Sequence, residues 1–139
     1  MNRETGDQEN KAAKVIAMPK VKSHRDLLVW QQSMELVIMI YAITKQFPKE
    51  EQYGLTTQIR RAAVSMPSNI TEGHARDYLK EYLQFLSMSL GSLAEVQTQL
   101  FIAKRLAYIP DQAFADAEDL ADKTFKMIKN LQRNLKEKL

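Results

Sequence analysis

The sequence of 139 residues contains no cysteine. This absence excludes disulfide frameworks, thiolate zinc sites and thiol nucleophiles, and it fits a reducing cytoplasm. Long apolar runs are also missing, since the longest extends from Leu36 to Ile43 and a membrane-spanning helix needs about 20 residues. The N-terminal segment is polar and charged, without the apolar stretch of a signal peptide. We therefore expect a soluble, cytoplasmic protein with no membrane partner.

Glycine and proline are both scarce, with four of each. No stretch combines alternating polarity with the β-branched residues typical of strands. Apolar residues instead recur every three or four positions, as they do along one face of an amphipathic helix. The sequence thus predicts an all-α fold, interrupted at Phe47-Pro48, at 73–76 and at Ile109-Pro110.

These interruptions define the expected domain organisation. Residues 1–22 carry no apolar periodicity and predict a flexible N-terminal tail, whereas residues 23–139 predict one domain. Four helices are expected in that domain, over 26–46, 51–72, 77–107 and 111–136. Because the connections are short, neighbouring helices should be antiparallel, which gives an up-down-up-down four-helix bundle. A domain of this size buries roughly two-thirds of its unfolded surface and needs no structural metal.

The first predicted helix carries apolar residues on two adjacent faces. One stripe is assigned to the core and consists of Leu27, Trp30, Met34, Val37 and Tyr41. The second stripe has the same spacing and consists of Val29, Ser33, Leu36, Ile40, Ile43 and Phe47. A helix in a monomeric bundle needs one such stripe, so the second predicts a surface covered by another molecule. We assign the apolar residues of this second stripe to an oligomer interface: Val29, Leu36, Ile40, Ile43 and Phe47.

Single residues inside the predicted helices carry further expectations. Pro67 removes one backbone hydrogen bond from the second helix and should kink it. Gly73 is expected to end this helix at the C′ position. Gly91 lies within the third helix, where glycine costs about 0.5–1 kcal/mol relative to alanine. We expect close packing at Gly91 to offset that cost.

Charge is segregated along the fourth predicted helix, which begins acidic and ends basic. Five basic residues at spacings of three and four share one face: Lys123, Lys126, Lys129, Arg133 and Lys136. This stripe suits a phosphate backbone, and it equally suits a solvated face that favours the helix dipole. The formal net charge of +3 gives only a modest attraction to nucleic acid. The candidate nucleic-acid surface is this stripe together with Lys104 and Arg105.

No arrangement of side chains typical of catalysis is visible. Glu72, His74 and the distant His24 lack the i, i+4 spacing of a helical metal site, and capping of a helix end explains His74 better. Ser65 and Ser68 have no partnered histidine and aspartate. We predict that the protein is not an enzyme, with no catalytic residues, no metal ligands and no cofactor.

Several segments closely resemble one known protein family. They are 28–31, Phe47-Pro48, 53–55, 58–70, Glu72-Gly73, Phe85-Leu86 and 91–95. Together they are similar to the four-helix-bundle family encoded by intervening sequences of bacterial large-subunit ribosomal RNA genes. That family is related to the accessory variability protein of diversity-generating retroelements. The resemblance covers residues 24–109, and it extends to the last helix by pattern alone.

The resemblance implies a ring-like homopentamer. It also implies structural or interfacial roles, and not catalytic ones, for six matching positions: Arg60, Arg61, Pro67, Asn69, Glu72 and Gly73. An ion pair and a phosphate contact both suit the two arginines. The retroelement relative is a basic scaffold that binds a reverse transcriptase and nucleic acid. We therefore expect a non-enzymatic homo-oligomer that associates with RNA or ribonucleoprotein through the basic residues. The alternative is an adaptor that docks a protein such as a reverse transcriptase, with no direct nucleic-acid role.

Overall fold

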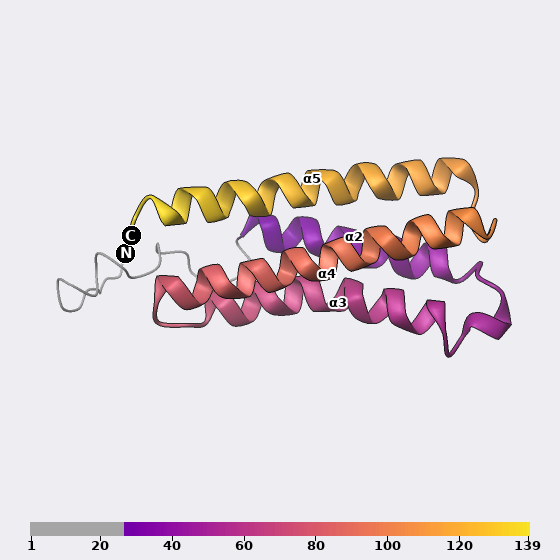
Figure 1. Ribbon diagram of the computed structural model, residues 1–139, viewed down its shortest axis with the longest axis horizontal. Helices are drawn as coiled ribbons and strands as arrows, with labels where there is room; N and C mark the ends of the chain where they lie inside the picture. Colours follow the sequence, from indigo (N-terminus) through magenta and orange to yellow (C-terminus); the bar gives the residue numbers. More distant parts are fainter. Residues whose placement is uncertain (1–26) are drawn as a thin grey trace.

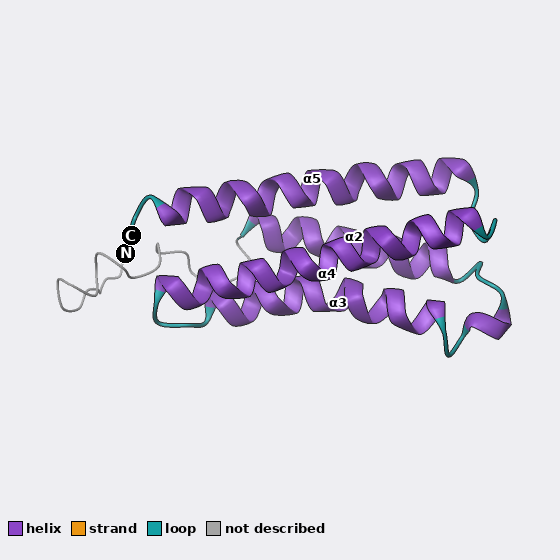
Figure 2. Cartoon of the chain, in the orientation of Figure 1, coloured by secondary structure: helices purple, strands orange, loops and turns teal. Residues whose placement is uncertain are grey.

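The computed structural model describes residues 27–139, and most of them lie in helices (Figures 1 and 2). The elements are α2 (Leu28–Thr44), the 3₁₀ helix η2 (Lys49–Glu51), α3 (Leu55–His74), α4 (Leu79–Arg105) and α5 (Asp111–Lys136). This part of the chain contains no strand, which confirms the predicted all-α class. The tail predicted over residues 1–22 lies outside the described residues.

The four long helices form an antiparallel up-down-up-down bundle, as predicted (Figure 1). Side-chain contacts between α3 and α4 show the opposite directions of the two helices. Ser92 Oγ donates to Ser65 Oγ at 2.8 Å, whereas Gln58, earlier in α3, contacts Gln99, later in α4. The packed pairs are α2 with α3, α3 with α4, α4 with α5 and α5 with α2. The bundle is therefore four-sided, with α2 diagonally opposite α4.

The side chain of Glu51 forms hydrogen bonds that link two chain connections at one end of the bundle. Glu51 in η2 accepts a hydrogen bond from the Leu55 backbone N–H at 3.0 Å and one from the Tyr108 hydroxyl at 2.8 Å. These two bonds hold the pKa of Glu51 below its usual value, and the bond from the Leu55 backbone has the larger effect. Since Leu55 begins α3 and Tyr108 follows α4, Glu51 fixes the α2–α3 connection against the α4–α5 turn.

Two glycine expectations are wrong. Gly73 lies within α3, which continues to His74, so Gly73 is not the C′ residue. A Cβ atom at Gly73 would lie 2.7 Å from the Phe85 Cβ, so this glycine allows a close approach of α4 to α3. Gly91 is exposed, and a Cβ there would meet no atom within 4 Å. The helix also continues past Pro67.

The interior consists of two hydrophobic clusters, one toward each end of the bundle. The first includes Leu36, Ile40, Ile59, Met66, Leu93, Leu100, Phe114 and Ala121. The second includes Val29, Ile70, Leu79, Tyr82, Leu86, Ile128 and Leu135. All four long helices contribute buried side chains to these clusters.

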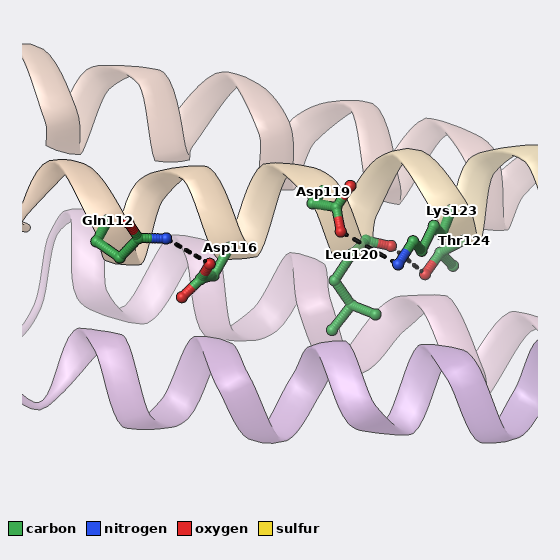
Figure 3. A network of polar contacts seen from close by, with 6 residues as sticks. All are labelled: Gln112, Asp116, Asp119, Leu120, Lys123 and Thr124. Carbon is green, nitrogen blue, oxygen red and sulfur yellow. Dashed lines mark hydrogen bonds and ion pairs between the residues drawn. The ribbon is translucent and has the colours of Figure 1, made fainter.

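Three fully buried hydroxyl residues lie between the two clusters along their helices. They are Ser33 on α2, Ser89 on α4 and Thr124 on α5, and we call them the hydroxyl layer. Ser89 Oγ donates to the Met66 carbonyl of α3 at 3.0 Å. Ser33 and Thr124 each donate to a carbonyl four residues earlier in their own helix, both at 2.8 Å (Figure 3 shows the bond of Thr124). All three hydroxyl groups of this layer are therefore hydrogen-bonded, as is usual for buried polar groups.

Candidate functional site

The basic residues predicted on the last helix are exposed along the second part of α5. Residues 123–136, here called the basic half of α5, contain five lysines and arginines and no aspartate or glutamate. Lys123 Nζ lies 3.2 Å from Asp119 Oδ2 (Figure 3), and Arg133 donates to Asn130 Oδ1. In residues 27–139 no ion pair is formed by Lys126, Lys129 or Lys136. Within the described residues these three side chains are exposed and not paired with a carboxylate.

The other two predicted basic residues lie at the opposite end of the bundle. Lys104 and Arg105 are exposed in the last turn of α4, and Lys104 Nζ is 4.5 Å from the centroid of the Phe114 ring. Phe114 is in the first turn of α5, and the 12 residues from there to Lys126 span about 18 Å of helix. The structure therefore does not bring Lys104 and Arg105 together with the basic half of α5.

The first part of α5 is acidic. Residues 111–122, the acidic half of α5, contain five aspartates and glutamates and no lysine or arginine. Gln97 of α4 donates to Asp122 Oδ1 at 3.1 Å and to Glu118 Oε1 at 3.3 Å. Partial burial raises the pKa of Glu118, and the charge of Asp122 adds to the increase, whereas the Gln97 hydrogen bond opposes it. Because like charges repel, this half of α5 is unfavourable for contact with phosphate.

The two apolar stripes of α2 have the reverse of their predicted roles. The residues assigned to an oligomer interface are buried inside the single chain: Val29, Leu36, Ile40, Ile43 and Phe47. In the stripe assigned to the core, Val37 is buried, Trp30 and Met34 are half-buried, and Tyr41 is exposed. The assignment of the second stripe to an interface is therefore wrong, because those branched side chains fill the interior. The first stripe is the more exposed of the two, although Val37 is part of the core and Leu27 and Trp30 pack against it.

The positions implied by the resemblance are dispersed over α3. Arg60 Nε donates to Thr44 Oγ1 at 2.7 Å, and its guanidinium carbon lies 4.6 Å from the centroid of the Tyr41 ring, so Arg60 ties α3 to α2. Asn69 donates to the backbone of its own helix and is half-buried. Arg61 is exposed, and Pro67 is buried beside the first stripe of α2.

An apolar groove lies between α3 and the first stripe of α2. We call it the apolar groove, and it is lined by Trp30, Met34, Val37, Val64, Pro67, Ser68, Thr71 and Glu72. Its volume is about 440 Å³, within the range of ~300–1,000 Å³ typical of ligand pockets. Val64 on its α3 side is 42% exposed. The groove thus presents aromatic and aliphatic surface to solvent on the described part of the chain.

A second apolar surface lies on the last turns of α4, and the sequence analysis missed it. This α4 patch consists of Thr98, Phe101, Ile102, Arg105 and Leu106. Phe101, Ile102 and Leu106 are 50%, 43% and 51% exposed. The Phe101 ring packs edge-on against Phe114, with ring centroids 4.9 Å apart. The signal in the sequence is that these three large apolar residues lie outside the series of buried residues on the same helix, which includes Leu93, Val96, Leu100 and Ala103.

The residues weighed for catalysis are used for packing and helix hydrogen bonds. His74 contacts the edge of Tyr82, with ring centroids 5.9 Å apart. Ser68 Oγ donates to the Val64 carbonyl one turn earlier. Among the described residues no group of three His, Asp or Glu side chains is placed to hold a metal ion, and His24 lies outside them. No helix in residues 27–139 is long and apolar enough to cross a membrane.

The comparison with protein families decides the family of this four-helix bundle. Residues 25–130 match the family model of the 23S rRNA-intervening sequence protein. The chain belongs to this family. The match extends over parts of all four long helices, and so it includes the helix that the sequence resemblance covered by pattern alone.

A solved structure supports the fold of this intervening sequence protein. It is the crystal structure of a protein of unknown function from the S23 ribosomal protein family of Bacteroides thetaiotaomicron VPI-5482. The two structures superpose with a TM-score of 0.71 at 19% sequence identity, covering 76% of this chain and 98% of the other. No curated protein matches the chain. At this identity the similarity establishes the bundle and not a shared activity.

Proposed function

We propose that this intervening sequence protein is a non-enzymatic homo-oligomeric scaffold that associates with RNA or ribonucleoprotein. The observation that carries the proposal is the basic half of α5, where exposed lysines and Arg133 recur at helical spacing. Lys126, Lys129 and Lys136 form no ion pair in the described part of the chain. Binding a polyanion there releases counterions from the nucleic acid without breaking pairs within the protein.

The geometry favours contacts with the RNA backbone over recognition of bases. Lysine and arginine side chains on one exposed helix face contact phosphates, which position a protein on nucleic acid and carry no direct sequence information. The exposed aromatic residues, such as Tyr53 and Phe125, are dispersed over different elements and do not form a stacking platform of the single-strand type. We propose recognition by charge and shape, with affinity that falls steeply as the salt concentration rises.

Self-association is the second part of the proposed function. The apolar groove and the α4 patch both expose large apolar side chains on one chain. Surfaces of this kind mark interaction sites, because monomeric proteins rarely expose large contiguous apolar areas. The family resemblance implies that the assembly is a homopentamer, and five copies would present five basic halves of α5 to one RNA.

The test combines Lys126→Glu, Lys129→Glu and Arg133→Glu in one variant. The probe is a fluorescent 20-base-pair RNA duplex, and anisotropy is measured from 50 to 200 mM salt. We expect the affinity to fall about 100-fold at 150 mM salt and the salt dependence to become shallower, because three phosphate contacts are lost. The mass of the assembly should not change, since these side chains lie outside both apolar surfaces.

A matched variant controls for net charge. Lys45→Glu, Lys49→Glu and Lys80→Glu change the formal charge by the same amount at exposed positions outside α5. This variant should retain most of the affinity. An equal loss in both variants would show a general charge effect, and unchanged affinity in the α5 variant would refute the role of its basic half. A wild-type chain that does not bind the duplex at 50 mM salt would instead favour a protein adaptor.

A further inference from the structure

The two apolar surfaces lie on different sides of the bundle. The apolar groove runs between α2 and α3, whereas the α4 patch is on the helix diagonally opposite α2. We infer that the α4 patch of one copy docks in the apolar groove of a second copy. This inference rests on the proposed self-association and specifies which surfaces meet.

The two surfaces are both lined mainly by apolar side chains. The groove offers Met34, Val64 and Pro67 as an apolar channel between two helices. The patch offers Phe101 and Ile102, which lie one turn before Leu106 on one exposed helix. An amphipathic helix that places large apolar side chains in a groove between helices is a recurrent mode of protein recognition.

The charges at the two surfaces are complementary. The charged residue that lines the apolar groove is Glu72, and the charged residue of the α4 patch is Arg105. Glu72 faces Arg76 of its own chain at 3.7 Å, a long distance between two side chains that are both largely exposed. Arg105 forms no ion pair with any of residues 27–139. A carboxylate and a guanidinium are therefore both available to pair across the contact.

The same charges argue against contacts between identical surfaces. Two grooves facing each other would place two Glu72 carboxylates in one interface that has no basic lining residue. Two patches facing each other would place two Arg105 guanidinium groups in one interface that has no acidic lining residue. Like charges in an interface disfavour that pairing. A groove-to-patch contact is heterologous, because each copy uses both surfaces with different neighbours, and such contacts close into rings when the rotation permits.

The experiment uses one exposed position on each surface. Val64→Glu places a charge in the groove, and Ile102→Glu places one in the patch; both positions are exposed in the single chain. Light scattering should show an assembled wild-type chain and two variants at the monomer mass of 16.0 kDa. Mixing the two variants should give a one-to-one complex of twice that mass, because one intact groove and one intact patch remain. Leu28→Glu, at a position 69% exposed outside both surfaces, is the control and should leave the wild-type mass.

A charge-reversal cycle tests the same contact without altering apolar side chains. Glu72→Arg and Arg105→Glu should each raise the dissociation constant of the assembly about tenfold, and the double variant should restore it to within about threefold. Circular dichroism of every variant checks that the bundle is folded. The cycle applies even if Val64→Glu or Ile102→Glu proves unstable.

The outcomes separate this inference from the proposed function. A wild-type chain that is monomeric at all concentrations overturns the proposed self-association and the contact together. An assembled wild type whose mass is unchanged by both Val64→Glu and Ile102→Glu overturns the contact alone. The contact is also overturned if only one of the two variants dissociates, since that result indicates pairing of identical surfaces. It is likewise overturned if two monomeric variants do not associate when mixed, since an intact groove and an intact patch are then both present.

Discussion

The two glycines inside the long helices have opposite surroundings. Gly73 faces α4, and a Cβ atom there would lie 2.7 Å from Phe85 Cβ and 3.0 Å from Tyr82 Cδ1. Gly91 faces open space. We expect Gly73→Ala to destabilise the bundle by about 1–3 kcal/mol through overpacking, and Gly91→Ala to stabilise it by about 0.5–1 kcal/mol through helix propensity. Urea unfolding measures both effects.

Gly91→Ala serves as the internal control, because it makes the same chemical change in an exposed helix. If both substitutions stabilise the protein to the same extent, α3 and α4 do not need the close approach at Gly73. The sequence predicted a helix end at Gly73 and close packing at Gly91, because the pattern within one helix does not show where a neighbouring helix approaches it. The difference depends on whether the neighbouring helix crosses at that residue.

Tyr82 buries a hydroxyl group within the second hydrophobic cluster. Its side chain is 2% exposed, and its hydroxyl has no hydrogen-bond partner among the described residues. Burial raises the pKa of Tyr82 to about 12. Because an unpaired buried hydroxyl is unfavourable, we expect Tyr82→Phe to increase the free energy of unfolding at pH 7 by about 1 kcal/mol. Chemical denaturation at pH 7 measures this difference.

The same residue predicts a pH dependence above the neutral range. Between about pH 10 and pH 12 the unfolded chain loses the Tyr82 proton while the folded chain retains it, so the folded state loses stability as the pH rises. Tyr82→Phe lacks this loss, and its advantage over the wild type should grow by on the order of 2 kcal/mol across that interval. An advantage that stays constant from pH 9 to pH 12 would contradict the burial of this hydroxyl.

At the scale of the element, α4 ends in a backbone conformation that suits glycine. Ala107 has a φ of 61°, and the Tyr108 N–H donates to the Ala103 carbonyl while the Ala107 N–H donates to the Lys104 carbonyl, both at 2.9 Å. This pair of bonds is the Schellman motif, in which glycine is the preferred C′ residue. We expect Ala107→Gly to stabilise the protein by about 0.5–1 kcal/mol, because alanine is strained at positive φ.

Thermal unfolding of Ala107→Gly checks this prediction, with Ala94→Gly as the control. Ala94 is exposed in the middle of α4, where glycine should cost about 0.5–1 kcal/mol. A lower melting temperature for both variants would show that the α4 end does not require the left-handed conformation.

The helix boundaries show what a periodic pattern determines. The last helix was predicted over 111–136 and is observed as Asp111–Lys136, because Pro110 marks its start and a single apolar stripe runs along it. The second helix was predicted to begin at residue 51, but α3 begins at Leu55. Residues 49–52 are strong helix formers, and the sign of the later start is Gly54, which directly precedes Leu55. The interruption itself depends on Glu51 and its bonds to Leu55 and Tyr108.

The reversed stripes of α2 show the limit of periodicity within an element. Both stripes have spacings of three and four, so either one satisfies the pattern of a core-facing helix. The choice depends on the neighbouring helices. Leu36 and Ile40 fill the interior, whereas Tyr41 lies at the edge, where Arg60 stacks on its ring. Aromatic residues with polar tips are favoured at such half-wet positions.

At the scale of the whole molecule, topology decides which basic residues are neighbours. Lys104 and Arg105 end α4, and the following turn brings the chain to the acidic half of α5. In an antiparallel bundle these two residues must therefore lie far from Lys126 and Lys136. The predicted antiparallel fold already implies this separation, which the charges of the residues alone do not show. RNA binding is accordingly expected to depend on one end of the bundle.

The hydroxyl layer has a consequence for how the molecule opens. It separates the two apolar clusters along α2, α4 and α5 by small, hydrogen-bonded side chains, whereas on α3 the buried Met66 lies at this level and its carbonyl accepts from Ser89. Local unfolding in proteins tends to follow such divisions, with each region opening as a cooperative unit. The end that holds Ile128 and Leu135 can therefore fray while the end that holds Leu36 and Leu100 stays closed. The basic half of α5 belongs to the end that frays, so a bound polyanion would also slow the exchange of its amide hydrogens.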